Sequence, residues 1–187
     1  MHGDLTKKLF ELAKDDIYKF RSEPFTLASG QQSQHYFNCK KITLLPGRLA
    51  LLADAIKNEV IPGFLSEGLP EAVGGLTLGA DPISYALSLA YHKDGSQVFP
   101  LVVRKEAKGH GTGKQIEGEI EKISEVIVLD DVITTAGSTL KAVQAFRSAG
   151  IAVNHAVCIV DREEGGSEAL QSENITLHSL YKKSDFL

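Results

Sequence analysis

The sequence has few cysteines, no long hydrophobic run and no excess of positive charge, and each absence excludes a class of function. Cys39 and Cys158 are far apart and lack the spacing of metal ligands, which predicts free thiols in a reducing compartment rather than a disulfide framework or zinc site. The N-terminus is charged and amphipathic and no apolar run could span a bilayer, so we expect a soluble, cytoplasmic protein without a membrane partner. The net charge of −4 predicts no nucleic-acid partner, and an anionic substrate would need a local basic cluster.

The chain is long enough for one domain with a full hydrophobic core. It has 187 residues, of which 43% are hydrophobic and 24% charged, and these are ordinary globular values. The predicted helices cover about residues 5–17, 49–60, 81–90 and 140–146, and the predicted strands 72–76, 98–103, 126–129, 153–160 and 175–180. Such alternation of helices and strands predicts the α/β class, with a largely parallel central sheet flanked by helices. We expect a single domain over residues 1–187, in which about residues 1–40 form a smaller cap.

The segment from Val126 to Thr139 carries the most information about function. Four apolar residues are followed by Asp130 and Asp131, then by a turn rich in small and hydroxylated residues, and then by a helical pattern. Backbone N–H groups in such a turn, together with the positive end of the helix dipole, bind phosphate. The two carboxylates can accept hydrogen bonds from the vicinal hydroxyls of a ribose. For either aspartate alone, helix capping would be the simpler interpretation, but the whole pattern favours a sugar-phosphate site.

Two other predicted strands also end in unusual segments, and parallel sheets bind ligands at the carboxyl ends of their strands. The first segment, 74–82, is glycine-rich, so its backbone can approach a second phosphate; Asp81 and Pro82 within it predict a capped helix start. The second segment, 104–114, contains four basic residues, one histidine and three glycines at alternate positions. This composition suggests a lid over a phosphate-rich ligand, although a solvated surface loop is the simpler alternative. Segment 104–114 matches neither the P-loop pattern nor the dinucleotide-binding glycine pattern.

Together these segments resemble the orotate phosphoribosyltransferase family, within the type I phosphoribosyltransferases. Segment 126–139 is similar to the family signature for phosphoribosyl pyrophosphate (PRPP), and Arg104–Gly111 is similar to the lid of the orotate enzymes. Three further segments agree and follow in the expected order: the N-terminal hood motif at 25–37, the pyrophosphate-side loop at 75–82 and the Asp-Arg-Glu-Glu-Gly-Gly segment at 161–166. The resemblance covers most of the chain and implies the type I phosphoribosyltransferase fold with a small N-terminal hood.

The resemblance implies that orotate and PRPP react to give orotidine 5′-monophosphate and pyrophosphate, with Mg²⁺ required and held mainly through PRPP rather than by protein side chains. Asp130 and Asp131 would hold the ribose hydroxyls. The catalytic groups implied are Arg104, Lys108, His110, Asp130 and Asp131. The PRPP-binding residues implied are Arg104, Lys105, Lys108, His110, Asp130, Asp131, Val132, Ile133, Thr134, Thr135, Ala136, Gly137 and Ser138, with Thr139 behind the phosphate turn. Because family lids reach the neighbouring subunit's site, a homodimer with a shared lid is also implied.

For the base, the resemblance implies that Thr134 and Arg162 contact orotate, that Arg162 pairs with its carboxylate, and that Tyr36 and Phe37 flank the pyrimidine ring. A guanidinium suits a planar carboxylate because it can bind both oxygens. The alternative for Arg162 is a surface ion pair with Glu163 or Glu164.

The sequence departs from the family pattern at two points. Ala28 stands where the hood motif often has Lys, which puts the hood's contribution to phosphate binding in question. Ala136 replaces a common glycine, and we expect it to keep a negative φ. Two rival functions on the same fold remain open: a purine phosphoribosyltransferase, which would lack the carboxylate clamp, and a nucleic-acid-binding regulator that senses PRPP.

Overall fold

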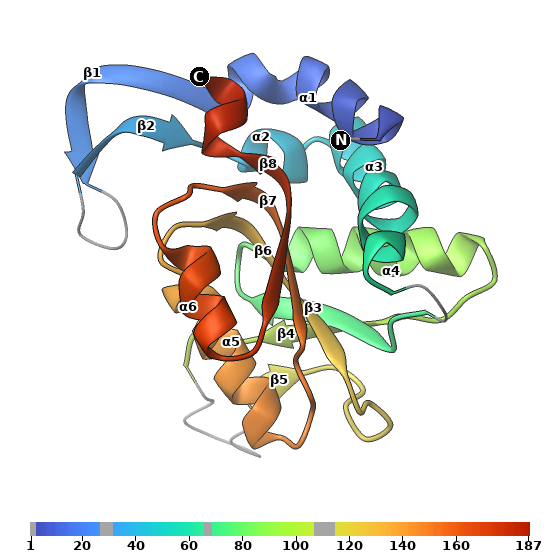
Figure 1. The fold of residues 1–187 in the computed structure, drawn as a ribbon. Helices are drawn as coiled ribbons and strands as arrows, with labels where there is room; N and C mark the ends of the chain where they lie inside the picture. Colours follow the sequence, from blue (N-terminus) through green and yellow to red (C-terminus); the bar gives the residue numbers. More distant parts are fainter. Residues whose placement is uncertain (1–2, 27–31, 66–68, 107–114) are drawn as a thin grey trace.

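The N-terminal part of the chain forms a helix and a separate two-stranded sheet (Figure 1). The computed structural model describes residues 3–26, 32–65, 69–106 and 115–187. Helix α1 (Asp4–Ile17) leads directly into β1 (Tyr18–Thr26), which pairs antiparallel with β2 (Gln32–Phe37). We call β1 and β2 the hood.

The rest of the chain forms a six-stranded sheet in the order β5-β4-β3-β6-β7-β8 (Figure 1). All of its strands run parallel except β5, which is antiparallel to β4. The strands are β3 (Ala72–Leu76), β4 (Phe99–Val103), β5 (Ile116–Glu117), β6 (Val126–Ile133), β7 (His155–Asp161) and β8 (Thr176–Lys182). The helices after β2 are α2 (Lys40–Thr43), α3 (Pro46–Ala55), the π turn η1 (Ile56–Val60), η2 (Ile61–Gly63), α4 (Asp81–Lys93), α5 (Gly137–Ser148), α6 (Gly166–Ser172) and η3 (Lys183–Phe186). The predicted α/β class with a largely parallel sheet is therefore confirmed.

Helices cover both faces of this sheet, and β6 shows why its sequence is continuously apolar. Ile127 and Leu129 belong to one hydrophobic core cluster, which also contains buried residues of α1, α3 and α4. Val126 and Val128 belong to a second cluster, built with α5 and α6. Because alternate side chains of a strand face opposite sides, a strand buried on both faces needs apolar residues at every position.

The strand order identifies where a ligand is expected to bind. Taken in chain order, the parallel strands β3, β4, β6, β7 and β8 are arranged as 2-1-3-4-5. In this doubly wound topology the connections from β3 and β6 leave in opposite directions, which opens a crevice between the carboxyl ends of these two strands. The loops that follow β3 and β6 are therefore the first candidates for a binding site.

Several element boundaries differ from the sequence prediction. Strand β6 does not end before the acidic pair but continues through it to Ile133, because its ladder with β7 extends that far. The predicted cap at Asp81 is wrong: Ala80 precedes the first helical residue without any side-chain cap, and Asp81 is already helical. Its Oδ1 atom is buried and has no hydrogen-bond partner in the part of the chain that the structure describes, and burial raises the pKa of Asp81.

Two absences expected from the sequence can be compared with the described residues. Cys39 and Cys158 are both free and buried, and burial raises the pKa of each thiol well above its ordinary value. Within the described ranges, no helix is both long and apolar enough to cross a membrane.

Candidate active site

The acidic pair lies in the carboxyl-terminal half of β6, next to the crevice where the strand order predicts a ligand. Asp130 is only 7% exposed. Its Oδ2 accepts a hydrogen bond from Thr139 Oγ1 at 2.9 Å, and its Oδ1 accepts one from the Asp131 backbone N–H at 3.0 Å. Asp131 is more exposed, and its Oδ1 accepts a hydrogen bond from the Val132 backbone N–H. The pair therefore presents one fixed, buried carboxylate and one carboxylate that a ligand can reach.

The turn after the pair encloses a pocket of about 220 Å³ at the start of α5. Its lining residues are Asp130, Val132, Ile133, Thr134, Thr135, Ala136, Gly137, Ser138, Thr139 and Lys141. Helix α5 has 12 residues, so the unpaired N–H groups of its first turn and its dipole favour an anion here. The size and donors of this pocket suit a phosphate group.

Ala136 enters this turn in the left-handed region, with φ = 62°, so the expectation of a negative φ is wrong. The residue must reverse the chain between β6 and α5, and its methyl group is buried in the core beneath the pocket. An L-residue with a Cβ adopts this conformation at a cost of about 1–2 kcal/mol, and the surrounding packing holds it there.

Burial and the neighbouring charge both disfavour the ionised form of Asp130. Loss of hydration is the larger effect and the charge of Asp131 the second, and together they raise the pKa of Asp130 to about 7. The hydrogen bonds from Thr139 and from the Asp131 backbone act in the opposite direction. Holding this carboxylate at the site therefore costs stability at neutral pH, as is common for groups that bind ligands.

This raised pKa predicts that the stability of the protein depends on pH. The folded chain binds the Asp130 proton more tightly than the unfolded chain does, so the free energy of unfolding should fall as the pH rises from 3.8 to about 7. Replacing Asp130 with Asn removes the charge and should raise the free energy of unfolding by about 2 kcal/mol at pH 8. Urea unfolding of the wild type and of Asp130→Asn, at pH 8 and at pH 4.5, measures the gain in the free energy of unfolding at each pH. A gain of equal size at both pH values would contradict this origin of the effect.

The loop after β3 meets the acidic pair from the other side of the crevice. A Cβ atom added at Gly79 would lie 2.5 Å from Asp130 Oδ1 and 2.8 Å from Asp131 Oδ1. These separations are shorter than any normal contact, so only glycine lets this loop pass so close to both carboxylates. The glycine-rich segment thus supports the geometry of the acidic pair.

We expect Gly79→Ala to impair the site. The new methyl group must displace Asp130 or Asp131, and a shift of about 1 Å in a positioned group can lower turnover about tenfold to a hundredfold. Steady-state turnover and the Tm together measure the effect. Gly47→Ala is the matched control, since nothing lies within 4 Å of a Cβ built there. Unchanged turnover in Gly79→Ala would contradict the close contact.

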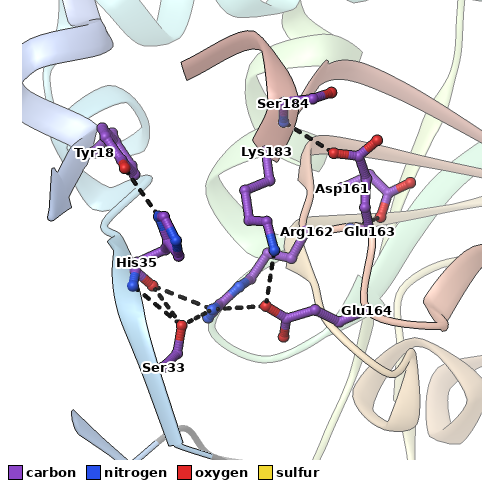
Figure 2. A network of polar contacts seen from close by, with 9 residues as sticks. All are labelled: Tyr18, Ser33, His35, Asp161, Arg162, Glu163, Glu164, Lys183 and Ser184. Carbon is purple, nitrogen blue, oxygen red and sulfur yellow. Dashed lines mark hydrogen bonds and ion pairs between the residues drawn. The ribbon is translucent and has the colours of Figure 1, made fainter. Parts of the chain in front are cut away.

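Arg162 lies one residue beyond β7, beside the phosphate turn. Its backbone N–H donates to the carbonyl of Ile133 at 2.9 Å, which brings it next to Thr134. Its side chain is only 3% exposed and lies over the ring of Phe37, with the guanidinium carbon 5.7 Å from the ring centroid. Figure 2 shows the guanidinium between the hood strand β2 and Glu164. The alternative of a surface ion pair is thus only partly correct: Arg162 pairs with Glu164, but the Arg162 side chain is buried.

Within the described part of the chain, the polar contacts of this guanidinium involve one of its nitrogen atoms, Nη2. Nη2 lies 2.9 Å from Ser33 Oγ, 3.1 Å from the His35 carbonyl oxygen and 3.0 Å from Glu164 Oε1. Nε is buried and has no hydrogen-bond partner among the described residues. A buried donor without a partner is costly, so this nitrogen is available for an acceptor on a ligand.

Known proteins identify the family to which this site belongs. No protein-family model matches the chain. Two curated relatives do: the orotate phosphoribosyltransferase of Leptospira biflexa serovar Patoc is 60% identical over 178 residues, 95% of each chain, and that of Aquifex aeolicus is 45% identical over 182 residues, 97% of each chain. The chain belongs to the orotate phosphoribosyltransferase family.

Solved structures of orotate phosphoribosyltransferases have the same fold. The Mycobacterium tuberculosis enzyme in complex with PRPP is 28% identical and superposes with a TM-score of 0.73, covering 100% of this chain and 94% of that chain. These relatives and solved structures confirm the family and the fold predicted from the sequence.

The other residues predicted for an orotate phosphoribosyltransferase site are only partly within the described chain. Arg104 forms an ion pair with Glu117 at 2.8 Å, and both side chains are about two-fifths exposed. Lys105 is exposed. Lys108, His110 and the hood residue Ala28 lie outside the described residues.

Tyr36 and Phe37 occupy consecutive positions on β2, so their side chains face opposite sides of the hood. Phe37 packs against Tyr18 and Phe186, with ring centroids 5.2 Å apart in each case. Tyr36 is half-buried, with the Arg21 guanidinium 5.6 Å from its ring centroid. Their contact with a pyrimidine stays a prediction. Because the two side chains face opposite sides of the hood, they cannot both pack against the same face of the ring.

Sequence reasoning missed two residues at the site. Lys141 lines the phosphate pocket; it lies one helical turn after Gly137, a spacing that could have revealed it. Lys183 lies beside Glu164, the ion-pair partner of Arg162, with Lys183 Nζ 3.7 Å from Glu164 Oε1. No sequence signal links Lys183 to Glu164, because the contact depends on how the C-terminal η3 packs against the loop after β7.

Proposed function

We propose that this chain transfers the 5-phosphoribosyl group from PRPP to orotate, giving orotidine 5′-monophosphate and pyrophosphate, a step of pyrimidine (UMP) biosynthesis. The observation that carries this proposal is the buried guanidinium of Arg162, whose Nε has no partner among the described residues, next to a phosphate pocket and an acidic pair. One crevice thus offers a group for each part of the substrates: the guanidinium for a carboxylated base, the acidic pair for a ribose and the pocket for a phosphate. A purine base has no carboxylate and would leave Arg162 without its ligand.

In this proposal the β6 side of the crevice holds the sugar and its phosphate. Asp130 and Asp131 accept hydrogen bonds from the ribose hydroxyls. The 5′-phosphate occupies the pocket between Val132 and Thr139, where backbone N–H groups of the turn and α5 face it and Lys141 adds a positive charge. Thr139 acts through Asp130, since its hydroxyl holds that carboxylate in place.

The leaving pyrophosphate gains negative charge as the C1′ bond breaks, while the sugar becomes cationic. We infer that Arg104, Lys105, Lys108 and His110 bind the pyrophosphate, because cations placed where charge develops lower the barrier most. The side chains of Arg104 and Glu117 are about two-fifths exposed, so water screens part of their attraction and the pair is weak. Arg104 can therefore exchange Glu117 for a phosphate oxygen at little cost.

The residues at the site are compatible with Mg²⁺ held mainly by PRPP. Among the described residues no group of three or more His, Cys, Asp or Glu side chains can enclose a metal ion. Mg²⁺ typically binds one or two carboxylates together with substrate phosphates and water, and Asp131 offers a reachable carboxylate. Bound Mg²⁺ would neutralise part of the charge on the pyrophosphate.

For the base, Arg162 pairs with the orotate carboxylate and Thr134 contacts the ring. Thr134 lines the phosphate pocket and follows Ile133, whose carbonyl accepts a hydrogen bond from the Arg162 backbone. These contacts fix the base beside C1′ of the ribose. Tyr36 and Phe37 are the hood residues proposed to contact the ring, and Phe37 already lies against the Arg162 guanidinium.

We also infer that the protein is a cytoplasmic homodimer in which each lid serves the neighbouring site. An exposed apolar face supports the dimer: Tyr85 is 50% and Leu89 is 60% exposed one turn apart on α4, and Leu78, in the loop before this helix, is 72% exposed. Monomers rarely leave such residues grouped on one helix. Each subunit would form one phosphoribosyltransferase domain over residues 1–187, with about residues 1–40 contributing to the hood.

One assay tests the proposed function. The loss of orotate absorbance is followed with PRPP and Mg²⁺ present, and orotidine 5′-monophosphate is identified by mass. Turnover that depends on both substrates supports the proposal, whereas turnover of adenine or guanine in place of orotate would contradict it. Filter binding with DNA and RNA tests the regulatory alternative, which the net charge of −4 already disfavours.

A further inference from the structure

The guanidinium of Arg162 already has a carboxylate partner from its own chain. Glu164 Oε1 lies 3.0 Å from Nη2, and the two side chains are 19% and 3% exposed. The second oxygen of this carboxylate, Oε2, is buried without a hydrogen-bond partner among the described residues. Among the described residues, Glu164 thus pairs with Arg162 through Oε1 alone, and both Glu164 Oε2 and Arg162 Nε have no partner.

The geometry of a guanidinium limits how a second carboxylate can bind. Nη1 lies on the Cδ side of the group, so both edges that present two parallel N–H bonds, Nε with Nη2 and Nη1 with Nη2, include Nη2. Nη2 carries two hydrogens, and these already face three acceptors: Ser33 Oγ, the His35 carbonyl and Glu164. A ligand carboxylate can therefore bind two N–H bonds of Arg162 only if one of these acceptors leaves.

Of the three acceptors, Glu164 has the most freedom to leave. The His35 carbonyl belongs to the backbone of β2, where His35 pairs with Phe20 of β1. Ser33 Oγ is held by a hydrogen bond from the His35 backbone N–H at 3.1 Å. Glu164 lies in the loop between β7 and α6, and only its side chain needs to move.

A second cation lies ready to receive Glu164. Lys183 Nζ is 3.7 Å from the same Oε1 atom, and Figure 2 shows it on the side of Glu164 next to η3. The loop and η3 are fixed to each other, because Glu163 Oε2 accepts a hydrogen bond from the Ser184 backbone N–H at 2.9 Å. A small rotation of Glu164 would therefore exchange Arg162 for Lys183 without moving the backbone.

We propose that Glu164 is an internal counter-ion that passes from Arg162 to Lys183 when the carboxylate of the base binds. The inference rests on the proposed function, in which Arg162 pairs with that carboxylate. Glu164 compensates the buried guanidinium until the ligand does so. Lys183 then compensates Glu164, which otherwise would repel the incoming carboxylate. Both are positioning residues that set the affinity for an anionic base.

A double-mutant cycle on the intact enzyme tests this exchange. At saturating PRPP, Lys183→Met should raise the KM for orotate about tenfold with little change in kcat, because Glu164 then stays on Arg162. Glu164→Gln should lower the KM about threefold, since it removes the competitor. In the Glu164→Gln background, Lys183→Met should have no further effect. Inhibition by uracil, the same pyrimidine without the carboxylate, should be equal in all four proteins.

Matched variants separate this role from simple loss of structure. Lys183→Arg keeps the charge and should keep the orotate KM, and Lys182→Met removes an exposed neighbouring charge and should leave it unchanged. The exchange is overturned if Glu164→Gln weakens orotate binding, or if the effect of Lys183→Met persists when Glu164 is absent. If the unmodified enzyme does not turn over orotate, the proposed function fails; if it does and the cycle shows no coupling, only the exchange fails.

Discussion

Replacing Arg162 with Ala should lower kcat/KM for orotate by about a hundredfold to a thousandfold, because it removes the buried cation that we propose pairs with the orotate carboxylate. Arg162 is 3% exposed, and its Nε has no hydrogen-bond partner among the described residues. PRPP affinity should change little, since the phosphate pocket does not include Arg162. Steady-state kinetics with orotate varied, and PRPP binding by calorimetry, measure the two effects separately.

Loss of Arg162 also leaves Glu164, which is only 19% exposed, with Lys183 as its remaining cation, and this should reduce stability. The double variant Arg162→Ala/Glu164→Gln removes this charge and serves as the control. Thermal unfolding shows whether it restores the Tm. If it restores the Tm but not orotate turnover, Arg162 acts on the substrate rather than on folding. Unchanged orotate turnover in Arg162→Ala would show that the base pocket is assigned wrongly and would reopen the purine alternative.

Lys108→Ala should lower turnover by about a hundredfold to a thousandfold, while the Tm stays unchanged. The expected cause is loss of a cation that stabilises the charge developing on pyrophosphate, and removal of one such donor typically has an effect of this size. Because the charge is greatest in the transition state, kcat should fall more than the KM for PRPP rises. Lys122→Ala is the matched control, as it removes an exposed lysine from the turn before β6.

Mixed dimers test whether the lid serves the neighbouring site. Subunits carrying Lys108→Ala are combined with subunits carrying Asp130→Asn and Asp131→Asn, and each kind of subunit should be nearly inactive alone. If lids cross between subunits, a mixed dimer contains one site with both an intact lid and an intact acidic pair, and activity should return to about one quarter of the maximum in a statistical mixture. Absence of any recovery, with mixed dimers present, would show that each lid closes over its own site.

Much of the fold was predictable because its signals are local. A strand buried on both faces must be apolar throughout, so the run at 126–129 indicated a central parallel strand. The hydroxylated turn at 134–139 and the acidic pair indicated a ribose-phosphate site, because backbone N–H groups and a helix start within the same segment build the pocket. The boundaries were less predictable: pairing with β7 carries β6 on to Ile133, and this depends on a strand some thirty residues later.

The sequence by itself therefore determined the fold class, the family, and the order of the sugar-phosphate, lid and base segments, since each is written in consecutive residues. The tertiary structure alone decided how those segments meet. Gly79 comes within contact of Asp130 because β3 and β6 are neighbours in the sheet. Packing forces the left-handed turn at Ala136 despite its Cβ. Arg162 takes its partners from Ser33 and His35, almost 130 residues earlier in the chain, and from Glu164 beside Lys183. Such contacts depend on strand order and on the docking of the hood, which no local pattern encodes.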